Sequence, residues 1–253
     1  AIPLYEKAIS IWPNYADAYS NLGKSLEETG RMPEAIHYYA KALEFDPTLP
    51  EALNNYGSAL TRAGRYEEAR KFYEEAMARR PDNYEAMSNM GSTYARQSDY
   101  KEAEKWYRRS IATNPLHPDA HNNLGSALGT QKKFDEAEKS YQEAIRLRPD
   151  FFEAHTNLAT LYLWRERYED AEREYARIVQ LWPNYAEGYN NLGTLAAQRK
   201  DYARAQAQYR RAIELKPEYP DPVVNLANTY RLAGKYADAG KLLVEAGKKW
   251  PNH

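Results

Sequence analysis

Seven asparagines recur every 34 residues without exception, and their type and spacing suggest a definite chemistry. A side-chain amide presents both a hydrogen-bond donor and an acceptor, which match the two polar groups of a peptide unit. Asparagine is also a mediocre helix former. Its repeated use inside helical segments therefore predicts contacts with something other than its own helix. We call these residues the asparagine row: Asn21, Asn55, Asn89, Asn123, Asn157, Asn191 and Asn225.

Small polar side chains flank the asparagine row at the same period. On a helical wheel at about 100° per residue they lie opposite the apolar stripe, so they face solvent or a ligand. An ordinary solvated face would carry Lys, Glu and Arg, so this floor predicts a binding groove. The preceding row is Ser20, Asn54, Ser88, Asn122, Thr156, Asn190 and Val224. The hydroxyl row, with a charged or amide residue at each end, is Lys24, Ser58, Ser92, Ser126, Thr160, Thr194 and Asn228.

The predicted groove changes character along the chain. Arg62 and Arg96 add positive charge to its first half, whereas Leu163, Trp164 and Leu232 make the later part apolar. An aromatic residue among small polar neighbours is a plausible anchor for a ligand side chain. Packing of Trp164 onto the next repeat is the alternative, and the sequence leaves both open.

No residue pattern indicates an enzyme. The chain has no Cys, which excludes disulfides, thiolate metal sites and a Cys nucleophile. It contains neither a Gly-rich phosphate loop nor a G-x-S-x-G motif. The abundant carboxylates belong to charged helix faces. We therefore predict no catalytic residues, no metal and no cofactor.

Two of the five histidines, His121 and His155, occupy the same position of adjacent 34-residue segments. Two imidazoles could begin a metal site, but no further ligand completes the set. They stand on the apolar stripe, where other segments carry Tyr19, Leu53 or Met87. We predict a packing role for both.

Charge and hydropathy exclude several classes of partner. Lys plus Arg is 35 and Asp plus Glu is 36, which gives a net charge of −1. Binding to nucleic acid or to an anionic membrane surface requires a basic excess, so neither is expected. No apolar run is long enough to span a bilayer. The chain begins with Ala in the middle of a repeat, so we expect it to be a fragment of a longer protein. The sequence does not indicate its cellular compartment.

Each 34-residue segment splits into two helical patterns. In the fourth, Ala120, Leu124 and Leu128 recur at helical spacing, and a second stripe follows a polar break. A proline then ends the second pattern, because it lacks an N–H and disfavours helix in the residue before it. Period-two alternation is absent, which predicts no strands. The prolines are Pro13, Pro47, Pro81, Pro115, Pro149, Pro183, Pro217 and Pro251.

This register sets the expected domain organisation: one continuous solenoid domain without insertions. Residues 1–15 form the second helix of a truncated repeat. Seven full repeats follow at residues 16–49, 50–83, 84–117, 118–151, 152–185, 186–219 and 220–253.

Small residues inside the helices predict close helix approach. A mid-helix glycine costs roughly 1 kcal/mol relative to alanine, so its repeated use indicates that a larger residue would hold the paired helices apart. Glycine or alanine stands at positions 23, 57, 91, 125, 159, 193 and 227.

Together these residues resemble the signature of the tetratricopeptide repeat, whose period is also 34 residues. The resemblance covers the whole chain. It implies an all-α, right-handed superhelical solenoid of antiparallel helix pairs, with the first helices lining the concave face. Tyr19 stands where the family often has Trp, and Leu243 replaces a Tyr. In the first repeat the matching residues are Leu22, Gly23, Leu26, Ala35, Tyr39, Ala42 and Pro47.

The asparagine row resembles the ladder with which the tetratricopeptide arm of O-linked N-acetylglucosamine transferases grips the substrate backbone. Helices packed about 8–10 Å apart would give an extended peptide, which advances about 3.3 Å per residue, one amide for every third residue. The alternative is that these amides bond to the neighbouring repeat and set the stacking. One amide can serve both purposes.

Acidic residues in the first helical turns narrow the choice of ligand. Family members that bind acidic chaperone tails carry basic residues at these positions, so that ligand is disfavoured. The main expected role of the acidic residues in this chain is to complement the helix macrodipole. The acidic row is Asp17, Glu51, Glu85, Asp119, Glu153, Glu187 and Asp221.

We therefore predict a protein–protein interaction scaffold that binds an extended peptide or partner segment in its concave groove. One alternative is the substrate-recruiting arm of a larger enzyme such as a glycosyltransferase. Another is an engineered or consensus-like repeat array. The terminal repeats carry no additional polar helix, so end-to-end self-association is also expected.

Overall fold

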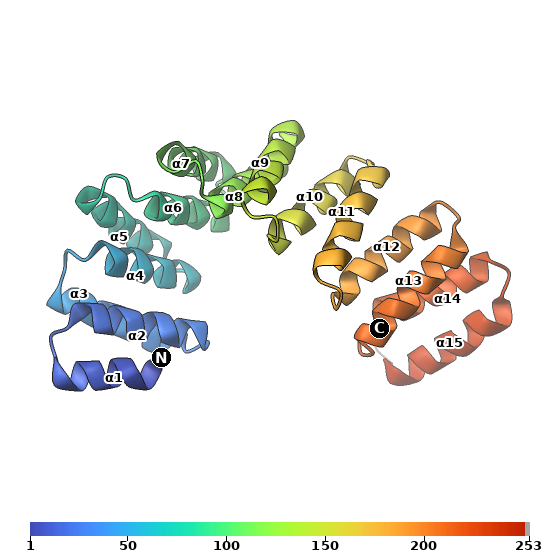
Figure 1. Ribbon diagram of the computed structural model, residues 1–253, viewed down its shortest axis with the longest axis horizontal. Helices are drawn as coiled ribbons and strands as arrows, with labels where there is room; N and C mark the ends of the chain where they lie inside the picture. The colour runs from blue at the N-terminus through green and yellow to red at the C-terminus, as the bar shows by residue number, and fades with distance from the viewer. Residues whose placement is uncertain (251–253) are drawn as a thin grey trace. The chain divides into compact units, whose positions relative to one another are not determined.

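The computed structural model describes residues 1–250, which contain fifteen α-helices and no strand (Figure 1). The predicted all-α class is confirmed. Pro251 and the end of the seventh repeat lie outside the described residues. The helices are α1 (Ile2–Ile11), α2 (Ala16–Glu28), α3 (Met32–Phe45), α4 (Pro50–Arg62), α5 (Tyr66–Arg79), α6 (Tyr84–Arg96), α7 (Tyr100–Thr113), α8 (Pro118–Thr130), α9 (Phe134–Leu147), α10 (Phe152–Trp164), α11 (Tyr168–Leu181), α12 (Ala186–Gln198), α13 (Tyr202–Leu215), α14 (Pro220–Leu232) and α15 (Tyr236–Lys249).

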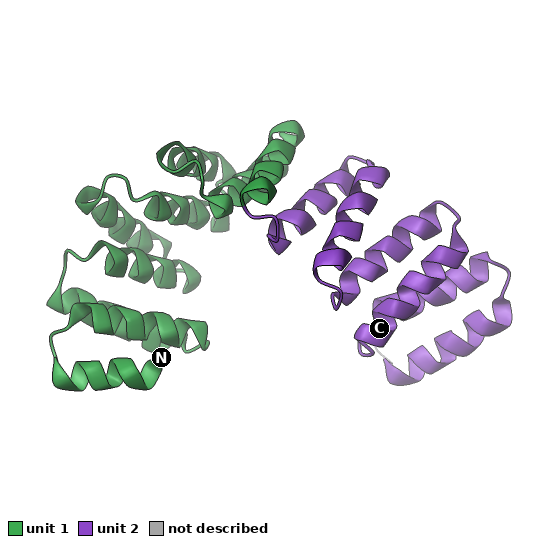
Figure 2. Ribbon diagram, viewed as in Figure 1, with its two compact units in different colours: residues 1–147 green, residues 148–253 purple. Residues whose placement is uncertain are grey.

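The chain divides into two compact units, residues 1–147 and residues 148–253 (Figure 2). Unit 1 holds α1 to α9, and unit 2 holds α10 to α15. Inside each unit, even-numbered first helices pair with the odd-numbered second helices that follow them. In unit 1 each first helix also contacts the next first helix, as α2 contacts α4, and in unit 2 α12 contacts α14. Both units are thus solenoids of helix pairs. One continuous solenoid over the whole chain stays a prediction.

A left-handed residue joins the two helices of every complete repeat. Gly30, Gly64 and Gly234 have φ values of 79°, 79° and 76°. After α2, Gly30 N–H donates to Glu27 O at 3.0 Å and Arg31 N–H donates to Leu26 O at 2.9 Å. This pair of bonds is the Schellman motif, which satisfies the last carbonyls of the helix. Four repeats place other residues at this turn, all with φ between 56° and 62°: Ser98, Lys132, Glu166 and Lys200.

Buried tyrosines explain the glycines inside the first helices. A Cβ added at Gly125 would lie 2.7 Å from the ring of Tyr141, which is 5% exposed. A Cβ at Gly23 would lie 2.8 Å from the ring of Tyr39, which is 1% exposed. The small residues therefore let the tyrosine of the second helix lie flat against the first helix. The same contact recurs at Gly57, Gly91 and Gly193.

Candidate functional site

The first helices of unit 1 line a shared hollow of about 580 Å³. The first four members of the asparagine row, one from each of α2, α4, α6 and α8, lie on its surface. Members of the preceding row lie beside them. The structure thus brings the predicted amides of unit 1 together on one concave face. The polar lining comprises Asp17, Ser20, Asn21, Lys24, Glu51, Asn54, Asn55, Glu85, Ser88, Asn89, His117, Asp119 and Asn123.

Two further hollows continue this surface toward the ends of the first helices. One of about 280 Å³ is lined by Asn55, Asn89 and Arg62, among others. Another of about 330 Å³ is lined by Asn123, Arg96 and two members of the hydroxyl row, among others. Because Asn55, Asn89 and Asn123 line two hollows each, we treat the three as one surface, the unit 1 groove. The predicted residues Ser92 and Ser126 belong to the third hollow.

Asparagine amides also connect neighbouring repeats. Asn89 Nδ2 donates to Asn54 Oδ1 at 3.0 Å, which joins α6 to α4. In unit 2, Asn225 Nδ2 makes the same bond to Asn190 Oδ1 at 3.0 Å. Each bond uses one N–H of the row amide, so the second N–H and the oxygen stay outside this contact. The stacking interpretation therefore holds for these two residues and leaves capacity for a ligand.

Tyrosines of the second helices donate hydrogen bonds to members of the hydroxyl row, a contact that the sequence did not predict. Tyr107 Oη donates to Ser92 Oγ at 3.1 Å, and Ser92 Oγ in turn donates to Ser88 O at 3.1 Å. Burial raises the pKa of Tyr107 to about 12, so its hydroxyl stays protonated as a donor. Equivalent bonds join Tyr141 to Ser126 at 3.2 Å and Tyr209 to Thr194 at 3.2 Å. Thr160 donates to Thr156 O at 2.9 Å.

Acidic side chains form one wall of the unit 1 groove. Glu51 accepts a hydrogen bond from Arg80 at 3.0 Å, and Arg80 also lies 4.0 Å from Glu85. Arg62 pairs with Glu27 at 2.9 Å, and Glu27 is only 14% exposed. The predicted positive charge of Arg62 is thus partly neutralised. Asp17 and Asp119 complete the acidic wall.

Unit 2 carries the later members of the asparagine row on α10, α12 and α14. Asn157, Asn191 and Asn225 are half-buried there. Trp164, the last residue of α10, is 63% exposed, and Leu232 is 47% exposed. This exposure favours the anchor interpretation of Trp164 over packing onto the next repeat. The corresponding positions of unit 1, Arg62 and Arg96 among them, line the groove hollows.

The two equivalent histidines hold the start of their own repeats. The Nε2 atoms of His121 and His155 lie 3.0 Å from Pro115 O and Pro149 O, respectively. Tyr19 and Tyr189 donate to the prolines six residues before them in the same way. The packing prediction, which was based on the position of both residues on the apolar stripe, agrees with this geometry. Among residues 1–250, no group of three His, Asp or Glu side chains is arranged to hold a metal.

His155 has a second acceptor. Its Nδ1 lies 2.8 Å from Glu174 Oε2, and the side chain is 4% exposed. Burial lowers the pKa of this imidazole, but the bonds to Glu174 and to Pro149 O outweigh burial and leave the pKa raised. Both ring nitrogens face acceptors, so the protonated form is favoured.

The fold and the groove define a helical-hairpin repeat protein with a concave polar surface. Models of the tetratricopeptide repeat match residues 16–49, 48–115, 85–150, 150–218 and 196–253. The chain belongs to the tetratricopeptide repeat family and, in general terms, is a protein-interaction scaffold. A comparison with curated proteins gives no match.

Solved structures show the same fold at low sequence identity. The crystal structure of the APC/C hetero-tetramer Cut9–Hcn1 aligns with a TM-score of 0.72 and 17% identity. It covers 89% of this chain, and this chain spans 45% of that one. PilF from Pseudomonas aeruginosa aligns with a TM-score of 0.69 and 22% identity, covering 82% of this chain and 95% of its own. In residues 1–250, none of the helices combines the length and apolarity that crossing a membrane requires.

Proposed function

We propose that the unit 1 groove binds an extended peptide segment of a partner protein. The observation that supports this is the gathering of Asn21, Asn55, Asn89 and Asn123 from four helices onto one concave surface. Amides can bond to both groups of a peptide unit. With first helices about 8–10 Å apart, one asparagine would meet every third residue of the ligand. The binding would therefore depend mainly on the ligand backbone.

The charge of the groove selects among peptide segments. Glu85, Asp17 and Asp119 place carboxylates along one wall, with Lys24 as a basic neighbour. Complementary charge favours correct partners, and like charges disfavour wrong ones. We infer that the ligand carries Lys or Arg beside an otherwise neutral stretch. An acidic tail would be repelled.

Unit 2 offers a contact of a different kind. Trp164 presents an exposed indole near the end of α10, and Leu232 ends α14 as an exposed apolar residue. Large aromatic side chains are frequent binding hot spots because they bury much apolar surface. Trp164 is proposed as an anchor for an apolar side chain of a bound segment. A substrate-recruiting arm of a larger enzyme would use the same surfaces.

The test begins with a phage-displayed library of random 12-residue peptides selected on the whole chain. The selected peptides are then measured against a variant carrying both Asn21→Ala and Asn55→Ala. Neither side chain makes a hydrogen bond to another described residue, so the fold should be unaffected. Loss of two backbone contacts, each worth about 0.5–1.5 kcal/mol, predicts binding about ten-fold weaker by calorimetry.

The matched control is Asn225→Ala. This substitution removes an amide that makes a stacking bond in unit 2 but does not line the unit 1 groove. Peptide affinity should be unchanged in this variant. Equal binding by the Asn21→Ala/Asn55→Ala variant, or a selection that enriches no peptides, would show the groove proposal to be wrong.

A further inference from the structure

Two arginines occupy the same position in successive repeats of unit 1 but have different surroundings. Arg62 ends α4 and Arg96 ends α6, and the sequence places them one 34-residue period apart. Arg62 Nη1 lies 2.9 Å from Glu27 Oε1, and Glu27 also accepts a hydrogen bond from Tyr39 Oη at 2.9 Å. The charge of Arg62 is therefore partly neutralised within the protein.

Arg96 lacks such a carboxylate because the repeat before it differs at one position. The residue one period after Glu27 is Thr61, which is 5% exposed. Its Oγ1 donates to Gly57 O at 3.0 Å and lies 2.8 Å from Thr93 Oγ1. Thr61 is thus a neutral member of a buried hydroxyl cluster. Among the described residues, no carboxylate forms an ion pair with Arg96.

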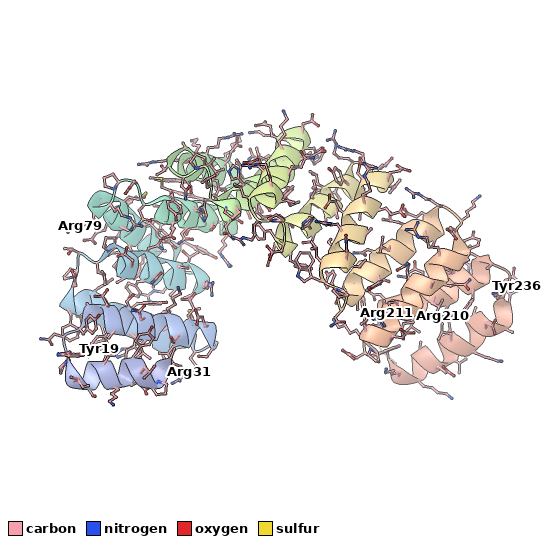
Figure 3. The ribbon with its side chains drawn as sticks, viewed as in Figure 1. Tyr19, Arg31, Arg79, Arg210, Arg211 and Tyr236 are labelled. Carbon is pink, nitrogen blue, oxygen red and sulfur yellow. The ribbon has the colours of Figure 1, made fainter. Side chains whose placement is uncertain are left out.

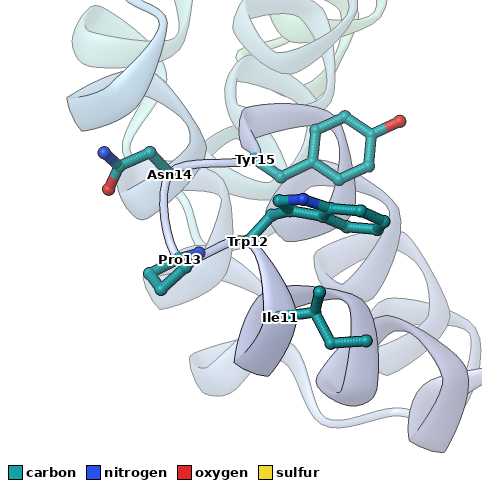
Figure 4. Close-up of a pocket in the computed structure, with 5 residues that line it drawn as sticks. All are labelled: Ile11, Trp12, Pro13, Asn14 and Tyr15. Atoms are coloured by element: carbon teal, nitrogen blue, oxygen red, sulfur yellow. The ribbon is translucent and has the colours of Figure 1, made fainter.

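The hollows of unit 1 also differ in charge. The loop after α1 borders a hollow of about 860 Å³, and its lining residues 11–15 are all uncharged (Figure 4). The hollow at Arg62 is lined by two basic and two acidic side chains, so its charges balance. Among the described residues that line the hollow of about 330 Å³ at Arg96, Arg96 alone is charged. We call this hollow the Arg96 pocket.

Other polar groups of the Arg96 pocket can help to orient an anion. Asn123 Oδ1 accepts a hydrogen bond from Asn122 Nδ2 at 3.4 Å, so the Nδ2 donors of Asn123 stay outside this bond. Arg96 lies close enough to the Tyr107 hydroxyl to lower its pKa, although burial leaves that pKa raised to about 12. The positive charge therefore acts inside the pocket. A guanidinium and an amide together offer donors that match a carboxylate or a phosphate group.

The Arg96 pocket lies at the opposite end of the first helices from the acidic wall. Glu85 is the second residue of α6 and Arg96 is its last, so about 16 Å of helix separates them. That distance exceeds the Debye length of about 8 Å at physiological ionic strength, so the wall repels an anion at Arg96 only weakly. One bound segment can therefore carry charges of both signs.

We propose that the Arg96 pocket binds one anionic side chain, a carboxylate or a phosphate, of the segment held in the unit 1 groove. This assignment rests on the proposed function and adds a second charge to its ligand. The bound segment would place a basic side chain against the acidic wall and an anionic one between Arg96 and Asn123. The alternative is that Arg96 donates only to backbone carbonyl groups, which predicts no preference for an anion.

The first test uses a selected peptide whose binding the Asn21→Ala/Asn55→Ala variant weakens. Each position of the peptide is replaced in turn by glutamate and by glutamine, and the affinities are compared by calorimetry. At one position glutamate should bind about five-fold more tightly than glutamine, because charge-assisted hydrogen bonds are stronger than neutral ones. Phosphoserine at that position separates the two sources of the anion. Tighter binding than glutamate assigns a phosphorylated segment, and equal or weaker binding assigns a carboxylate.

Variants of the protein locate the preference. Arg96→Gln should remove the preference for glutamate. The matched control combines Arg62→Gln with Glu27→Gln, which removes the equivalent arginine together with its half-buried partner and leaves no buried charge unpaired. The control should keep the preference. Only the ratio of the glutamate and glutamine affinities is compared, because both arginines line the unit 1 groove.

Inorganic phosphate tests the Arg96 pocket without a peptide. In NMR spectra of the whole chain at constant ionic strength, the arginine Nε–H signal that Arg96→Gln removes should shift saturably with phosphate. The signal that the control removes should shift less. Equal shifts, or glutamate bound no better than glutamine at every position of the peptide, overturn the assignment. If the selection yields no peptide, the groove proposal fails, and the phosphate titration alone decides whether the pocket binds an anion.

Discussion

At the scale of single residues, His155 illustrates how a buried imidazole depends on its acceptors. Its Nδ1 faces Glu174 and its Nε2 faces Pro149 O, at 2.8 Å and 3.0 Å. These bonds raise its pKa in the folded state despite burial. A group with a raised folded pKa adds stability below its unfolded pKa, about 6.5. That stability is lost as the pH rises through the folded value.

We therefore predict that unfolding by urea shows greater stability at pH 6 than at pH 8 because of His155. The comparison is with His155→Tyr, since Tyr189 donates to Pro183 O at 3.2 Å from the equivalent position. In the variant, the free energy of unfolding should not show the increase between pH 8 and pH 6 that His155 contributes. An identical pH profile in both proteins would contradict the assignment, and an NMR titration of the imidazole measures the pKa directly.

Gly125 provides a second residue-scale prediction. Alanine there would gain roughly 1 kcal/mol of helix propensity, but its Cβ would lie 2.7 Å from the buried ring of Tyr141. Overpacking of this kind typically costs about 1–3 kcal/mol, and alanine at this position of α10 shows that a repeat can adapt. We expect Gly125→Ala to lower the unfolding free energy by about 1 kcal/mol net.

Gly129, one turn later in the same helix, is the control for that measurement. A Cβ there meets nothing closer than 3.9 Å. Gly129→Ala should therefore raise the midpoint of thermal unfolding, while Gly125→Ala lowers it. Two shifts of the same sign would refute the tyrosine explanation.

The sequence predicted which residues line the groove, but it did not predict the hydrogen bonds that these residues make with one another and with neighbouring helices. The asparagine row follows from a simple period, and four of its members meet in one hollow. The bond from Tyr107 to Ser92 was not predicted, because it joins two helices whose relative rotation is set by packing. For the same reason the bond from Asn89 to Asn54 could be named only as an alternative.

At the scale of secondary-structure elements, the turn inside each repeat sets the angle between paired helices. Three repeats place glycine at its left-handed position, whereas Ser98 and Lys200 adopt a φ of 62° there. A left-handed conformation costs a non-glycine residue about 1–2 kcal/mol. The polar break was predicted from sequence, but the left-handed residue was not, since four repeats lack the glycine that signals it.

Replacing such a residue should therefore stabilise the chain. Lys200→Gly is expected to raise the unfolding free energy by about 1 kcal/mol in urea, because the exposed side chain makes no buried contact. The reverse change, Gly64→Lys, should lower it by a similar amount. If the two substitutions change stability in the same direction, the backbone explanation fails.

At the scale of the whole molecule, the 34-residue period predicts a pair of helices in each repeat. The expected repeat boundaries fall between the observed helices, because proline and the turn residues interrupt helix formation locally. The division into two compact units was not expected, since neighbouring repeats share the same local pattern.

The expected end-to-end association stays a prediction. Exposed apolar side chains on both terminal helices, including Tyr236 at 71%, favour it (Figure 3).

The sparse burial of the terminal helices has a consequence for how this protein opens. Within the described residues, α1 has no fully buried side chain and α15 has only two, Ala239 and Ala246. Detaching either helix therefore exposes little apolar area, whereas an inner helix packs against neighbouring helices on two sides. Amide protons should exchange with solvent first in these outer helices. Fraying would then proceed inward, one hairpin after another, rather than as a single global event.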